Sequence, residues 1–188
     1  MKQKILIAVA ALGALVAFGA GDDSKLPATV RRIDRLKDAQ ADAKQQKKAV
    51  AFVMSEVKKG GNKLVLEATQ QVFTKLRGQC VFVYINFFSE RGKLAKALPK
   101  INEAFDSEDL KKSPIPRTVV TDPNGEKIYA LIPYIPEGKL GEEMFKEARQ
   151  KIADALAGKA SGDDVTVAGG KAREIAPPPP VKKDKNQQ

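Results

Sequence analysis

The chain has 188 residues, a formal net charge of +10 at pH 7, no histidine and one cysteine. The absence of histidine excludes His-based acid/base catalysis and His metal ligation, and a lone cysteine excludes an intrachain disulfide. We therefore predict no metal site and no cofactor. Because the basic residues are spread along the chain, without tryptophan or an arginine cluster, we predict a solvated lysine-rich surface rather than nucleic-acid binding.

The first 19 residues have the pattern of a secretory signal peptide. Two early lysines precede an apolar run, Ile5–Ala17, and small residues place the cleavage point after Gly19. Residues 20–25 would then be a linker. For a bacterial protein this predicts a periplasmic or extracellular address. The alternative is an uncleaved leader that holds the protein at the membrane, although the run is short for a membrane span.

The first half of the predicted domain alternates helices with buried strands. We expect one long helix over Leu26–Lys48, a strand over Ala49–Met54 and a polar loop over Ser55–Lys63. An amphipathic helix follows and ends near Gly78, and a second apolar run, Cys80–Phe87, predicts another strand. Because both runs are continuously apolar, we expect parallel strands buried on both faces, in a right-handed βαβ unit.

The next segment combines a helix with a proline-marked turn. Ser89–Phe105 has helical spacing of its apolar residues, and Pro99 inside it predicts a kink or two short helices. The dipeptide Ile115-Pro116 precedes a strand over Arg117–Asp122. The sequence Asp122-Pro123-Asn124-Gly125 is strong turn chemistry, since Pro presets φ and Asn and Gly tolerate positive φ.

The domain closes with a strand, a helix and a tail. We expect a strand over Lys127–Ile132 and an amphipathic helix over Leu140–Leu156, so that the domain spans 26–158. From 159 to 188 the chain is rich in charged residues, glycine and proline. We predict a disordered tail with a short polyproline stretch at Pro177–Pro180, because too few apolar groups offset the entropy of ordering it.

This order of elements, with Ile-Pro before a strand and a hairpin leading to a last helix, resembles the thioredoxin-like superfamily. The resemblance implies an α/β fold in which a central mixed sheet (βαβ plus ββα) is flanked by helices. It also implies a cis Ile115-Pro116 bond beside the site loop. In that family a Cys-x-x-Cys motif begins the helix after the first core strand, where the helix dipole lowers the pKa of the first thiol. The matching loop here, Ser55–Lys63, has no cysteine, so thiol exchange through that site is excluded.

We therefore expect a non-catalytic domain that binds a protein or peptide in the cell envelope, with no catalytic residue. The resemblance places the peptide at Ser55, Glu56, Ile115 and Pro116, where the backbone pairs with an extended segment. An anionic envelope component is a further partner suggested by the basic surface. Two alternatives stay open. One is a divergent redox enzyme that uses Cys80, which otherwise reads as a small buried hydrophobe. The other is a structural envelope protein anchored by its leader.

Overall fold

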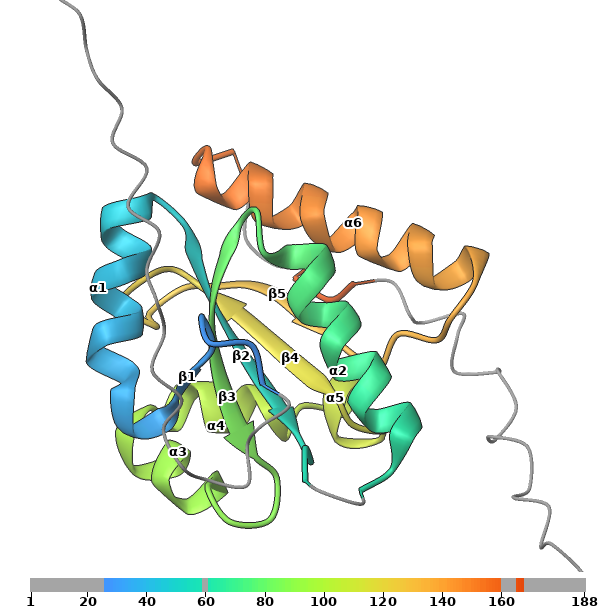
Figure 1. Cartoon of the computed structure of the whole chain (residues 1–188). Coiled ribbons are helices and arrows are strands. Elements are labelled where there is room, and N and C mark those ends of the chain that lie inside the picture. The colour runs from blue at the N-terminus through green and yellow to red at the C-terminus, as the bar shows by residue number, and fades with distance from the viewer. Residues whose placement is uncertain (1–25, 59–60, 160–164, 168–188) are drawn as a thin grey trace, which may run out of the picture.

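The computed structural model describes residues 26–58, 61–159 and 165–167 (Figure 1). The predicted signal peptide (1–19) and linker (20–25) lie outside the described residues, as does most of the predicted tail.

A five-stranded mixed sheet forms the centre of the domain. Its strands are β1 (Arg31–Arg32), β2 (Ala49–Ser55), β3 (Cys80–Asn86), β4 (Arg117–Thr121) and β5 (Ile128–Ile132), in the spatial order β1-β3-β2-β4-β5. β1 and β2 run parallel to β3, whereas β4 runs antiparallel to both β2 and β5. The predicted α/β class and the mixed sheet are confirmed.

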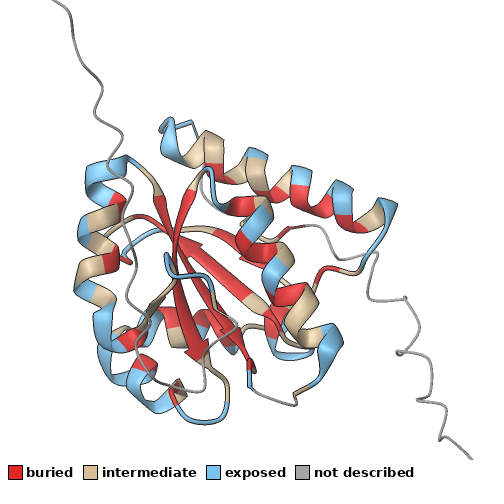
Figure 2. Ribbon diagram, in the orientation of Figure 1, coloured by how far each residue is buried: buried red, intermediate tan, exposed pale blue. Residues whose placement is uncertain are grey.

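Helices cover both faces of the sheet (Figures 1 and 2). One face is packed by α2 (Lys63–Leu76) and α6 (Lys139–Leu156), and the other by α1 (Leu36–Gln46), α3 (Arg91–Ala97) and α4 (Pro99–Phe105). Two single-turn elements, η1 (Ile33–Arg35) and α5 (Glu108–Lys111), complete the order. The helices bury their inner stripes and expose their polar sides, as their amphipathic spacing predicts.

The two central strands divide their side chains between two hydrophobic cores. In β2, Ala51 and Val53 face the core under α2 and α6, while Phe52 and Met54 face the core under α1, α3 and α4. All seven residues of β2 are buried. The prediction of strands buried on both faces is therefore confirmed, and it explains why these runs have no polar alternation.

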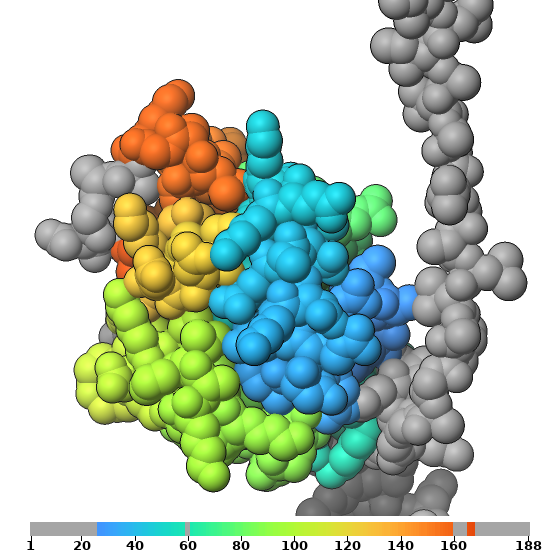
Figure 3. Space-filling model, turned by 90° about the vertical axis from the view of Figure 1, so that its left-hand side faces the viewer, coloured from blue at the N-terminus to red at the C-terminus, as the bar shows by residue number. Residues whose placement is uncertain are grey.

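The predicted helix over Leu26–Lys48 is wrong in its first ten residues. Arg31–Arg32 forms the edge strand β1, a 3₁₀ turn follows, and the α-helix begins only at Leu36. In the second half of the predicted helix, Ala39 and Ala43 are fully buried. Their small side chains let α1 approach the sheet closely. Figure 3 shows α1 beside the β4–β5 turn, where the Gln40 side chain donates to a backbone carbonyl of that turn at 3.1 Å.

The turn and the proline behave as their chemistry predicts. Asp122 holds the β4–β5 turn, since its carboxylate accepts hydrogen bonds from three backbone N–H groups of the next five residues. Gly125 has φ +80°, a conformation that glycine adopts without steric cost. Pro99 opens α4 directly after α3, so the expected two short helices are confirmed.

A short segment of the predicted tail packs on the sheet. Thr166 forms a parallel bridge with Leu131 of the edge strand β5, and the backbone bonds on either side of it are 2.8 and 2.9 Å long. Val167 is fully buried in the core under α6. The structured domain therefore extends past the expected boundary at 158 to include residues 165–167.

Candidate functional site

The four residues predicted to bind a peptide lie at one end of the sheet. β2 and β3 finish at this end and β4 begins there, at the bottom of Figure 1. In register, Ser55 at the end of β2 pairs with Asn86, and the preceding Met54 pairs with Arg117. The Ile115-Pro116 bond is cis. The structure thus brings the end of β2 and the start of β4 together, as expected.

Ser55 supports the loop from below and does not face solvent. It is fully buried, and its hydroxyl lies 2.7 Å from the Thr69 hydroxyl on α2. Thr69 in turn donates to the Val65 carbonyl at 2.6 Å. The Ser55 side chain therefore joins β2 to the first turns of α2, and only its neighbours can contact a ligand directly.

A buried tyrosine fixes the start of the same loop. The Tyr84 hydroxyl accepts a hydrogen bond from the Val57 backbone N–H at 2.9 Å and donates to the Ser55 carbonyl at 3.3 Å. Tyr84 and Val57 are both buried. Because a buried N–H without a partner is costly, this bond gives the loop a defined path out of the sheet.

The loop then leads into α2 through polar residues. Glu56 is largely buried and forms an ion pair with Lys58, while the Asn62 side chain caps α2 by accepting from the Leu64 backbone N–H at 2.9 Å. Asparagine is among the residues preferred at this N-cap position. In the loop that the resemblance matches to the cysteine motif, this chain has an ion pair and a capped helix start.

Ile115 presents an unpaired piece of backbone at this end. Its side chain is half-buried, and neither its N–H nor its C=O has a hydrogen-bond partner among the described residues. Pro116 is buried and holds the segment against the fold. Most backbone polar groups in a folded domain are paired with protein or water. The Ile115 backbone is therefore available to an added extended segment.

Three residues that sequence reasoning did not select lie at the same end of the sheet. Arg117 places its guanidinium 5.9 Å from the centre of the Phe87 ring, and Phe87 meets Phe88 edge-on at 5.0 Å. Phe88 is 71% exposed. The sequence Asn-Phe-Phe-Ser-Glu could have indicated Phe87 and Phe88. Two consecutive aromatic residues at the end of a strand point to opposite sides, so the sheet cannot bury both.

An ion pair with a buried carboxylate stabilises the β3–α3 connection, which also carries Phe87 and Phe88. The Glu90 side chain is 4% exposed and accepts from Arg32 at 2.8 Å, while its second oxygen accepts from the Asn86 backbone N–H at 2.9 Å. Each carboxylate oxygen thus has a donor. We therefore assign the Arg32–Glu90 pair a structural role, which is to hold the β3–α3 connection in place.

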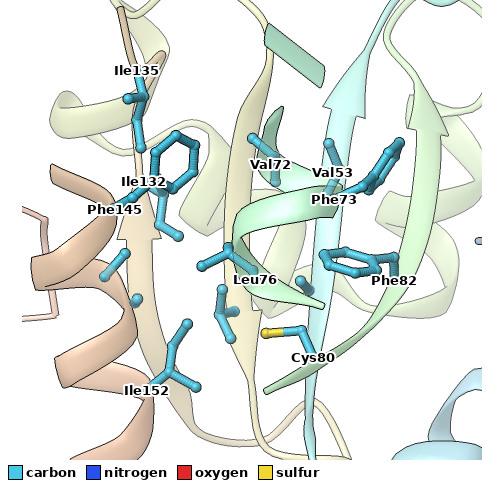
Figure 4. Close-up of a cluster of buried hydrophobic side chains, with 14 of the residues drawn as sticks. Val53, Val72, Phe73, Leu76, Cys80, Phe82, Ile132, Ile135, Phe145 and Ile152 are labelled. Atoms are coloured by element: carbon cyan, nitrogen blue, oxygen red, sulfur yellow. The ribbon is translucent and has the colours of Figure 1, made fainter. Parts of the chain in front are cut away.

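Cys80 lies in the core under α2 and α6, far from the loop predicted by the resemblance. It opens β3, is 3% exposed and belongs to the cluster that includes Leu76 and Phe82 (Figure 4). Burial raises the pKa of the thiol to about 12, against a smaller opposing effect of Lys48. The expectation of a small buried residue is confirmed, and a thiol with this pKa is protonated at neutral pH.

The described residues contain no group of three or more potential metal ligands of the His, Cys, Asp or Glu type. Among the helices that the structure describes, none has the length and apolar character to span a membrane. Comparisons with models of protein families, with curated proteins and with solved structures found no match to this chain.

Proposed function

We propose that the chain is an exported, non-catalytic thioredoxin-like domain that binds an extended protein or peptide segment in the cell envelope. The order of elements supports the fold assignment, because β2-α2-β3 is a βαβ unit and β4-β5-α6 is a ββα unit. The leader sequence supports the address. The proposed binding surface is the end of the sheet around Ile115.

The unpaired backbone of Ile115 is the observation that carries the binding proposal. In the resembled family, the backbone at this position pairs with an extended substrate. Here the N–H and C=O of Ile115 have no partner in the described part of the chain, and Phe88, which follows β3 at the same end of the sheet, is exposed. An extended segment would satisfy the two backbone groups and cover the aromatic ring, which is the pattern of β-strand addition.

The absence of cysteine from the loop separates binding from redox chemistry. In the resembled family the first thiol stands where the loop meets the helix, and its lowered pKa supplies a nucleophile. The corresponding residues here are Glu56 and Lys58, which pair with each other. A surface that still accepts a peptide but cannot form a mixed disulfide with it would hold the peptide without changing it.

Site-specific photo-crosslinking in the producing cell tests this proposal. A photoreactive phenylalanine analogue is placed at position 88, and a matched control carries it at Leu156, which is 37% exposed at the end of α6. We expect protein adducts from position 88 and few from position 156. Equal labelling from both positions, or none from position 88, would contradict binding at this end.

The address is tested separately by mass spectrometry of the protein recovered from cell fractions. A mature N-terminus near Ala20 in the periplasmic or secreted fraction supports export and release. A protein that starts at Met1 in the membrane fraction supports the structural alternative, in which the leader is retained as an anchor.

A further inference from the structure

Arg117 is a half-buried cation without a carboxylate partner among the described residues. Its Nε donates to the Ser113 carbonyl at 2.7 Å, and the guanidinium lies near the Phe87 ring. In the described part of the chain, neither the ion pairs nor the hydrogen bonds involve its terminal nitrogens. Partly buried arginines are normally paired, because their desolvation is costly.

The charges around Arg117 leave this region positive. Arg91 lies close enough to lower the pKa of Arg117 together with burial, which is the larger cause. The nearby Asp106 opposes this effect, but its carboxylate already forms an ion pair with Arg91. One carboxylate therefore faces two guanidinium groups, and the Arg117 group is the one left without a direct anionic contact.

This cation is continuous with the proposed binding surface. The Arg117 side chain reaches back to Ser113, two residues before the unpaired backbone of Ile115. On its other side it lies over Phe87, which in turn contacts the exposed ring of Phe88. This end of the sheet thus offers two backbone hydrogen-bonding groups, a planar cation and an exposed aromatic ring.

We propose that the terminal nitrogens of Arg117 bind a carboxylate of the partner segment, while Phe88 contacts an apolar side chain beside that carboxylate. This inference rests on the proposed function and names its ligand class, an extended peptide with an acidic group next to an apolar residue. The guanidinium fork matches a carboxylate in two parallel hydrogen bonds, which lysine cannot reproduce. The carboxylate belongs either to an Asp or Glu side chain or to a free C-terminus.

The probe is a library of phage-displayed random peptides selected on the full, purified chain. We expect the selected peptides to be enriched in Asp or Glu next to Leu, Ile, Val or Phe. Selected peptides are then synthesised with the acidic residue or its amide counterpart, and each of these with a free or an amidated C-terminus. Loss of binding on the Asp/Glu-to-amide change identifies a side-chain carboxylate, and loss on amidation identifies the C-terminus.

The matched variants are Arg117→Gln, Arg117→Lys and the control Arg77→Gln. Arg77 is exposed and follows α2 at the opposite end of the sheet. We expect R117Q to weaken the acidic peptide about tenfold to a hundredfold, as for loss of a charge-assisted hydrogen bond. R117K should bind with intermediate affinity, R77Q should match the parent chain, and the amide peptide should bind the parent chain and R117Q equally.

Two results overturn the inference in different ways. Selected peptides without acidic enrichment that bind R117Q and the parent chain equally would refute the carboxylate site and leave peptide binding intact. Failure to select any peptide would refute both proposals. The comparison of acidic and amide peptides on the unsubstituted chain requires no variant, so it decides the question even if R117Q does not fold.

Discussion

Ionisation of Cys80 links the stability of the domain to alkaline pH. The thiol is 3% exposed, and burial raises its pKa from 9.0 to about 12 in the folded chain. In the unfolded chain the thiol regains its ordinary pKa. The native state therefore favours the neutral thiol, and its advantage is fully present below pH 9 and is lost as pH rises from 9 towards 12.

The size of this loss follows from the two pKa values. Between about pH 8 and about pH 10.5, ionisation of the unfolded thiol lowers the free energy of unfolding by about 2 kcal/mol. Lysine and tyrosine also titrate in this range. Their contribution is common to the parent chain and to Cys80→Ala, so the difference between the two proteins isolates the thiol.

The assay is urea unfolding of both proteins at the two pH values, under a thiol-free reductant. We expect the stability of the parent chain relative to Cys80→Ala to fall by about 2 kcal/mol at the higher pH. A difference that does not change with pH would mean that the native thiol ionises freely, and the burial argument would fail. That result would revive the redox alternative, which insulin-reduction and peroxide-consumption assays of the parent and Cys80→Ser proteins would then decide.

Three further substitutions test the packing around the site and the sheet edge, each measured by urea unfolding. Glu90→Ala should cost about 2 kcal/mol, because it removes the buried carboxylate to which Arg32 and the Asn86 backbone N–H donate, whereas the exposed Glu103→Ala should cost almost nothing. Val167→Ala should cost about 1–3 kcal/mol if the segment after α6 is part of the core, and no effect would place it outside the cooperative unit. Gly141→Ala should cost about 1–3 kcal/mol, since its new Cβ would lie 1.9 Å from the Pro136 carbonyl oxygen; a neutral result would mean that this loop shifts freely.

Much of the fold is predictable because its strongest signals are local. A short, continuous apolar run such as Ala49–Met54 is typical of a central strand that is buried on both faces of a sheet. Pro99 cannot continue a helix, and the Asp-Pro-Asn-Gly turn leaves the backbone few alternatives. These features depend on neighbouring residues alone, so they can be recognised without knowing the tertiary structure.

The missed features depend on partners that are distant in the sequence. Arg31–Arg32 has no apolar alternation and becomes a strand only because β3 offers an unpaired edge. Residues 165–167 are held by Leu131 and by the Asp109 carboxylate, which accepts from the Thr166 hydroxyl at 2.8 Å. From the sequence alone, Arg117 is indistinguishable from the other charged residues of the surface. That no described carboxylate pairs with it becomes visible only when the carboxylates near it have been placed.

The polar groups at the candidate site divide into those that face inward and those that face outward. The Ser55 and Thr69 hydroxyls bond to each other, and Thr69 also bonds to the backbone of α2. The Tyr84 hydroxyl bonds to the loop backbone, so the three side chains hold the loop and α2 in place. A serine nucleophile needs a general base within hydrogen-bond reach, and the side-chain partner of Ser55 is another hydroxyl. The groups left without partners among the described residues, the Ile115 backbone and the Arg117 terminal nitrogens, are hydrogen-bonding groups and not reactive ones. A rigid support beneath unsatisfied recognition groups favours binding, since a ligand meets them already oriented and loses little entropy in ordering them.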